Sequence, residues 1–186
     1  QSIRSNESSN NSSKGDDCSV EKDFPRRIMA LIAPQMISLM SPLNAPQASG
    51  AMAAEIIMTA FQTYAMAAQN SMGFPVISMP AFSAGKAQLK SGMMSPVPAG
   101  AMHAQLLAGA INTAWMSVQT QFQVAPVVAN IGVLLSQLNL VTAVPVPAGI
   151  QYIQGLANAI DLYCKSSIIT GVIPGTPPVP FTGPPM

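Results

Sequence analysis

A repeat with a period of about 50 residues is the feature of this sequence that most restricts its fold. Three segments align on Gly50, Gly100 and Gly149, which lie 50 and 49 residues apart. A proline lies shortly before each glycine, and the last two copies share the string PVPAG. Self-similarity at a fixed period is typical of one supersecondary unit used several times. We therefore expect three tandem units.

Several positions agree in residue type when the three segments are aligned. The fifth position after the glycine always carries a hydrogen-bonding side chain, but only the first copy has a charge there. Such a set can form a ring around a threefold axis or a stripe that faces solvent, and we favour the stripe. An apolar residue and an aromatic residue recur further along. The candidate interaction residues are Glu55, Gln105, Gln154, Phe61, Ile111, Ile160, Tyr64, Trp115 and Tyr163.

Each aligned segment is predicted to form a helix over residues 50–66, 100–116 and 149–165. Proline near the first turn favours a helix start, and apolar residues recur at steps of three and four, as in Ile57, Phe61 and Tyr64. These helices are rich in alanine and methionine, which suits close packing against neighbouring copies. We expect their apolar faces to be available to other subunits.

A proline-rich segment follows each helix and predicts an extended arm. Residues 73–86 and 168–186 combine repeated prolines with β-branched residues, which disfavours helix interiors and central strands. The middle copy differs, and IGVLLSQLNL within it is compatible with a further helix. The predicted fold class is mainly α with extended Pro-rich arms, as three tandem helix-plus-arm repeats in a pseudo-threefold arrangement.

The amino-terminal part is predicted to be separate from the repeats. Residues 1–22 are rich in Ser and Asn and cannot bury enough apolar surface to fold alone. The next segment has Asp23 and Pro25 at a helix start, and Pro34 inside it predicts a kink. The expected organisation is a flexible polar arm at 1–22, a short kinked helix at 23–44, and repeats at 45–95, 96–144 and 145–186.

Charge is scarce in the repeats. Charged residues form 8% of the chain, against roughly 25% in ordinary soluble domains. A surface with so few charges is poorly solvated, so protein neighbours or lipid should cover it. The charged residues after residue 27 are Glu55, Lys86, Lys90, Asp161 and Lys165.

No catalytic or metal-binding pattern is present in the sequence. The repeats contain one histidine, His103, and two carboxylates, and no phosphate-loop, nucleophile-elbow or zinc-protease motif occurs. We interpret His103 as a packing or surface residue. Cys18 and Cys164 lack metal-ligand spacing, although a disulfide between them is an open alternative. We expect no enzyme, no cofactor and no bound metal.

Nucleic acid and membrane are both disfavoured as partners. A net charge of +1 gives no basis for following phosphates. A membrane span needs about 20 mainly apolar residues, whereas Asn and Gln interrupt residues 101–122 and 125–143. No signal peptide is visible in the polar first residues. Gln1 at the start is compatible with proteolytic maturation or with missing upstream residues.

The last unit resembles small virion structural proteins of T4-like tailed phages, particularly marine ones. The resemblance is carried by Ala159, Ile160, Asp161 and Tyr163, followed by a Pro/Gly/Val-rich stretch over 170–183. The first two units lack the Ile-Asp pair, and the chain ends in PPM instead of a basic glycine tail. The resemblance implies a virion component without catalytic residues.

The expected function is therefore a non-enzymatic structural subunit of a large assembly. A place in the tail, baseplate or neck of a virion is expected, with capsid decoration as another position. Its partners would be other structural proteins of the same assembly, or copies of itself. A membrane-associated or pore-forming protein is the main alternative, and an adhesive or receptor-binding module is the third.

Overall fold

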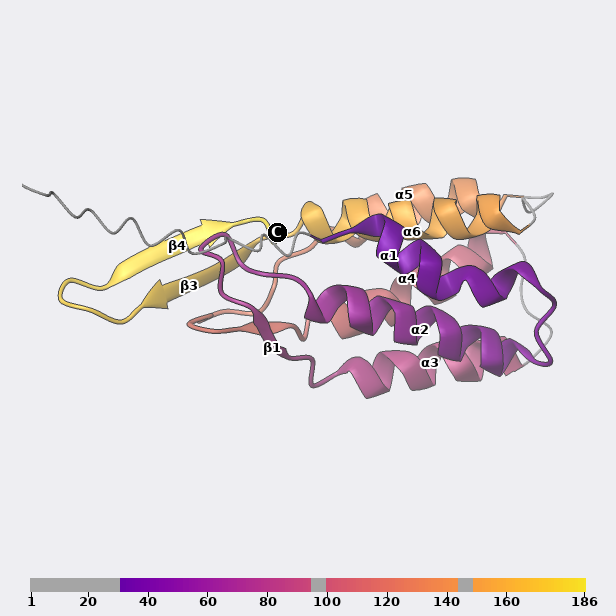
Figure 1. Cartoon of the computed structure of the whole chain (residues 1–186), viewed down its shortest axis with the longest axis horizontal. Coiled ribbons are helices and arrows are strands. Elements are labelled where there is room, and N and C mark those ends of the chain that lie inside the picture. The colour runs from indigo at the N-terminus through magenta and orange to yellow at the C-terminus, as the bar shows by residue number, and fades with distance from the viewer. Residues whose placement is uncertain (1–30, 95–99, 144–148) are drawn as a thin grey trace, which may run out of the picture.

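The computed structural model describes residues 31–94, 100–143 and 149–186. These residues are mainly helical, as predicted, and four short strands lie at one end of the helices (Figure 1). The predicted arm over 1–22 lies outside the described residues. In chain order the elements are α1 (Ala33–Met40), a 3-10 turn (Ser41–Asn44), α2 (Gly50–Met66), β1 (Val76–Ser78), α3 (Phe82–Met94), α4 (Ala101–Trp115), β2 (Gln119–Thr120), α5 (Ile131–Val141), α6 (Ile150–Lys165), β3 (Ile169–Ile173) and β4 (Val179–Gly183).

The three long helices α2, α4 and α6 begin at or next to the aligned glycines, which confirms the predicted helices to within one residue. Gly100 and Gly149 have φ values of 64° and 57°, which L side chains rarely adopt. Gly50 is required for a different reason, because a Cβ there would collide with the carbonyl oxygen of Met93. Ser49 instead caps α2 by accepting a hydrogen bond from the Met52 amide at 3.2 Å.

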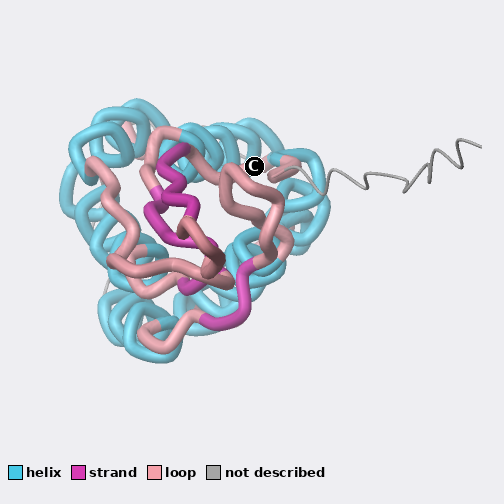
Figure 2. Tube along the Cα trace, turned by 90° about the vertical axis from the view of Figure 1, so that its left-hand side faces the viewer, coloured by secondary structure: helices cyan, strands magenta, loops and turns pink. Residues whose placement is uncertain are grey.

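The shorter helices α1, α3 and α5 each pack between two long helices. Helix α3 packs against α2 and α4, α5 against α4 and α6, and α1 against α6 and α2. Figure 2 looks along the bundle and shows the resulting triangular cross-section. Every long helix is therefore flanked by two short ones.

The prediction of an extended arm over residues 73–86 is wrong in part. Residues 73–86 were expected to be extended, but only Val76–Ser78 forms a strand and α3 begins at Phe82. Pro80 lies just before that helix, where its fixed φ is compatible with a helix start. Residues 23–30 of the kinked helix expected over 23–44 lie outside the described residues, so that expectation stays a prediction. In the described part α1 begins at Ala33, and Pro34 occupies its first turn. The further helix considered at IGVLLSQLNL is confirmed as α5.

The strands form two small antiparallel pairs. β1 pairs with β2, and β3 pairs with β4 along five residues each, from Ile169 opposite Gly183 to Ile173 opposite Val179. The β3–β4 hairpin extends beyond the helices (Figure 1). Residues 168–186 thus contain two paired strands, and their contact with a neighbouring protein stays a prediction.

The core lies along the inward faces of the long helices. Counted from the aligned glycine, positions 4, 7, 8, 10, 11, 14 and 15 are buried in α2, in α4 and in α6. The expectation that these apolar faces remain available to other subunits is therefore wrong. The short helices of the same chain pack against the long helices, and α3 includes part of the segment that was expected to be an extended arm.

Candidate interaction sites

The six apolar and aromatic candidates belong to one buried core inside the chain. All of them are at most 1% exposed, so none can touch another protein in this conformation. The rings of Phe61 and Trp115, for example, lie 6.3 Å apart at an angle of 59°. The buried candidates are Phe61, Ile111, Ile160, Tyr64, Trp115 and Tyr163.

Two tyrosines link the long helices through equivalent hydrogen bonds. The Tyr64 hydroxyl on α2 donates to Asp161 Oδ1 on α6 at 2.7 Å. The Tyr163 hydroxyl on α6 donates to Asn112 Oδ1 on α4 at 2.6 Å. Both donors occupy position 14 after the aligned glycine and both acceptors occupy position 12. Burial raises the pKa of both tyrosines, so the phenols remain protonated donors at neutral pH.

Helix α4 has a different link at the corresponding place. Its position 14 is Ala114, and the neighbouring Trp115 donates from its indole Nε1 to Ser167 Oγ at 3.0 Å. Ser167 in turn donates to the carbonyl of Cys164. Burial raises the pKa of the Cys164 thiol, so it stays protonated, which makes it a poor nucleophile. Cys18 lies outside the described residues.

The position 12 acceptors were missed from sequence, although a signal was present. Gln62, Asn112 and Asp161 are all polar and lie two helical turns after the polar fifth position, on the same side of each helix. Their amide and carboxyl groups can all accept a hydrogen bond. Asn112 and Asp161 do so, whereas Gln62 is exposed.

The polar candidates Glu55, Gln105 and Gln154 do not form a ring. Gln105 and Gln154 are exposed, in agreement with the solvent-facing stripe. Glu55 forms ion pairs with Lys86 and, at 3.2 Å, with Lys90, both on α3. Hydrogen bonds from Lys86 and then from Lys90 lower the pKa of this carboxyl group. The fifth position therefore faces solvent on α4 and α6, whereas on α2 it forms an ion pair with α3.

His103 is a packing residue near the beginning of α4. Its Nε2 lies 3.0 Å from the hydroxyl of Tyr152, which occupies the same position on α6. Burial lowers the pKa of His103 and raises the pKa of Tyr152 to about 12. Nδ1 is buried without a hydrogen-bond partner. This neutral, buried pair agrees with the packing interpretation made from sequence.

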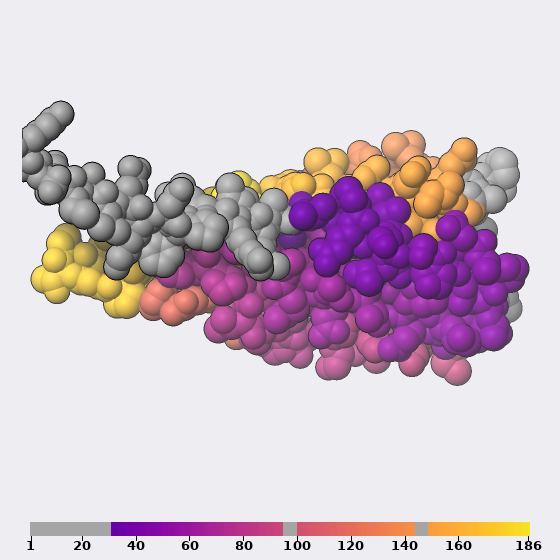
Figure 3. Space-filling view, viewed as in Figure 1, coloured from indigo at the N-terminus to yellow at the C-terminus, as the bar shows by residue number. Residues whose placement is uncertain are grey.

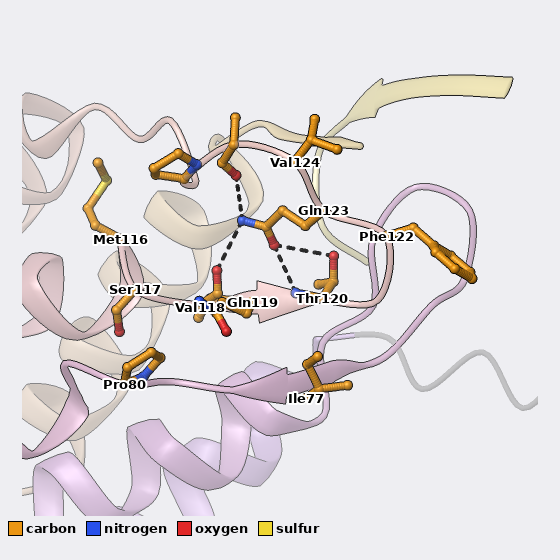
Figure 4. A pocket seen from close by; sticks show the side chains of 12 residues that line it. Ile77, Pro80, Met116, Ser117, Val118, Gln119, Thr120, Phe122, Gln123 and Val124 are labelled. Atoms are coloured by element: carbon orange, nitrogen blue, oxygen red, sulfur yellow. Dashed lines mark hydrogen bonds between the residues drawn. The ribbon is translucent and has the colours of Figure 1, made fainter. Parts of the chain in front are cut away.

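A hollow of about 620 Å³ lies between β1 and the loop after α4 (Figure 4). The Gln123 side chain crosses it: Nε2 donates to the carbonyls of Val118 at 3.1 Å and Ala125 at 2.7 Å. Oε1 accepts from the Thr120 amide at 2.8 Å. The amide group at the centre of this hollow is therefore used to hold the loop in place.

Among the described residues, no group of three or more His, Cys, Asp or Glu side chains is placed to hold a metal ion. Within the same ranges, none of the helices has the length and apolar character needed to cross a bilayer. Comparisons with protein-family models, curated proteins and solved structures find no match for this chain.

Proposed function

We propose that this chain is a non-enzymatic structural subunit in which three tandem units, in a pseudo-threefold arrangement, do the work of three copies of a shorter protein. The observation that carries the proposal is the burial of the same seven positions in all three long helices. The equivalent tyrosine hydrogen bonds between α2, α6 and α4 support it. One chain then supplies a shape that a closed homotrimer would otherwise supply.

The surface supports a role inside a larger assembly. All charged side chains of the described ranges take part in ion pairs, Glu55 with two lysines of α3 and Asp161 with Lys165 at 2.9 Å. Large apolar side chains are exposed elsewhere, which favours burial against neighbours. The most exposed, each at 60% or more, are Ile77, Met94, Met102, Val124, Val128 and Leu140.

The proposed location is a tailed-phage virion, in the tail, baseplate or neck or as a capsid decoration. The resemblance of the last unit to virion structural proteins of T4-like phages supports this location. In the proposal the β3–β4 hairpin contacts neighbouring subunits, because edge strands and grooves are common peptide-binding modes. The partners are other structural proteins of the same particle.

Quantitative mass spectrometry of purified particles tests this role. We expect a fixed copy number relative to the major structural proteins, retained after washing in high salt. Recovery of the chain with phospholipid in the detergent phase, and not in particles, would refute the proposal and favour the membrane-associated alternative.

Surface variants test whether exposed apolar side chains form the proposed contacts in particles. Leu140→Gln and Ile77→Thr remove exposed apolar groups and should lower incorporation into particles. Gln105→Ser changes an exposed polar residue of a long helix and is the matched control. Equal incorporation of all three variants would exclude these apolar side chains from the proposed contacts.

A further inference from the structure

Three antiparallel strand contacts close the end of the bundle at which the long helices finish. Each involves the residue 19 positions after an aligned glycine. The Ile168 and Val128 backbones exchange two hydrogen bonds of 2.8 and 3.0 Å, and those of Gln69 and Met186 exchange two of 2.9 and 2.8 Å. The three contacts are Gln119 with Ser78, Ile168 with Val128, and Gln69 with Met186.

These contacts follow a cyclic order. The segment that follows α2 pairs with the residue just after α4, and the segment that follows α4 pairs with the residue just after α6. The end of the chain, which follows α6, pairs with the residue just after α2. In the first two cases the chain continues within a few residues into a short helix, α3 or α5. In the third case the chain ends at Met186, and α1, from the other end of the sequence, occupies the corresponding place.

Helix α1 matches α3 and α5 in how it is anchored. Each short helix inserts two fully or nearly fully buried side chains spaced four residues apart, which lie on one helix face. Figure 3 shows α1 in indigo lying against the orange α6 and the purple α2. Figure 1 draws the C-terminus at the end of the bundle where α1 begins. The anchor pairs are Met36 and Met40, Leu89 and Met93, and Leu134 and Leu138.

We propose that the described residues form a closed ring of three units in which the break between Met186 and α1 lies at one of three equivalent seams. A seam is defined here as a strand contact together with the short helix that follows it. Two seams are crossed by the continuous chain, and Met186 and α1 complete the third without a covalent link. This inference rests on the three-unit proposal above and is independent of where the protein acts.

Circular permutation of the full chain tests the equivalence of the seams. In each permutant Met186 is joined to Gln1, so residues 1–30 become the linker, which can span up to about 100 Å. One permutant opens the chain between Met79 and Pro80, and the other between Ala129 and Asn130, so that Asn130 still caps α5. The control carries the same join but opens inside α4, between Ala108 and Gly109.

Both seam permutants should fold, because every strand contact and every short-helix contact is retained. We expect cooperative urea unfolding, the far-ultraviolet circular dichroism of the natural chain, and a buried emission from Trp115, the single tryptophan. The melting temperature should fall by no more than about 5 °C, as expected for loss of one or two hydrogen bonds in a chain of this size. The α4-opened control should lose cooperative unfolding.

If either seam permutant behaves like the α4-opened control, the three seams are not equivalent and the inference is wrong. Joining Met186 to Gln1 without opening the chain gives a second measurement. This cyclised protein should melt no lower than the linear chain, and a lower melting temperature would also overturn the inference. Neither failure would alter a fixed copy number in particles, so the structural role is judged separately.

Discussion

The Tyr64 hydroxyl and the Asp161 carboxylate form a 2.7 Å hydrogen bond between residues that are 97 positions apart in the sequence. The bond joins the first long helix to the last, and Tyr163 forms the equivalent bond to Asn112. One of these acceptors is charged and the other is neutral. Because the two hydrogen bonds have equivalent positions, comparing them shows how much the charge of the acceptor contributes to stability.

We predict that Tyr64→Phe destabilises the protein more than Tyr163→Phe. Hydrogen bonds to charged groups contribute about 1.5–3 kcal/mol and those between neutral groups about 0.5–1.5 kcal/mol. Urea unfolding of both variants, followed by Trp115 fluorescence, measures the difference in the free energy of unfolding. A larger loss for Tyr163→Phe would contradict the ranking.

Gly85→Ala should destabilise the contact between α3 and α4. A Cβ at this position would collide with the carbonyl oxygen of Ala110. This oxygen belongs to the backbone of α4, so it cannot shift without distorting that helix. Overpacking of this kind typically costs about 1–3 kcal/mol. Thermal unfolding monitored by circular dichroism provides the measurement.

Gly109→Ala on the facing helix is the matched control. Its Cβ would meet the flexible Gln88 side chain, with Nε2 at 2.9 Å. Alanine also favours a helix over glycine by up to about 1 kcal/mol, so this variant should be neutral or stabilising. Equal destabilisation by both substitutions would show that α3 and α4 do not approach closely at Gly85.

Trp115→Phe and Ser167→Ala should be non-additive. Each removes one partner of the 3.0 Å hydrogen bond from the indole Nε1 to the serine hydroxyl. Contacting residues usually show coupling energies of about 0.5–3 kcal/mol in a double-mutant cycle. Circular dichroism must report unfolding, because the substitution removes the fluorophore. Additive losses would mean that the two side chains do not interact.

His103 should make stability depend on pH just below neutrality. Burial lowers its pKa in the folded state, whereas in the unfolded chain the pKa is about 6.5. As pH falls below about 6.5 the unfolded chain binds the proton first, so stability is highest above that pH and decreases toward the folded-state pKa.

His103→Gln tests this dependence, since glutamine can still bond to the Tyr152 hydroxyl but does not titrate. The free energy of unfolding, measured between about pH 7.5 and 5.5, should change less in the variant than in the natural chain. Glu55 does not interfere in this range, because its pKa is lowered from an already acidic value. Identical pH slopes for the two proteins would rule out the titration of His103.

Local signals explain which helices could be predicted from the sequence. The long helices were located to within one residue. Their signals are prolines, glycines and apolar residues spaced three or four apart, which all lie within the helical segment itself. Helix α3 was missed because Pro75 and Pro80 precede it and Gly85 and Gly92 lie inside it, so the local pattern favoured an extended arm. Its stability comes from packing between α2 and α4, which no local pattern reports.

The location of the candidate residues was harder to predict for the same reason. Tyr64 and Trp115 were identified as important, but their partners, Asp161 and Ser167, come from distant parts of the chain. The Gln69 contact with Met186 joins residues too far apart for any spacing rule. The sequence patterns identified residues that make specific contacts. The tertiary packing places most of these contacts within the chain, not at its surface.

The β3–β4 hairpin projects beyond one end of the triangular bundle, and it is the longer of the two strand pairs in the described residues (Figure 1). A body with three nearly equal faces can enter a matching socket in three rotational settings, which are separated by very little energy. In the proposed assembly a single projecting hairpin would remove this ambiguity, because it would fit its neighbour in one setting only. The proposed subunit would then present a trimer-like shape at one fixed rotational angle about the bundle axis.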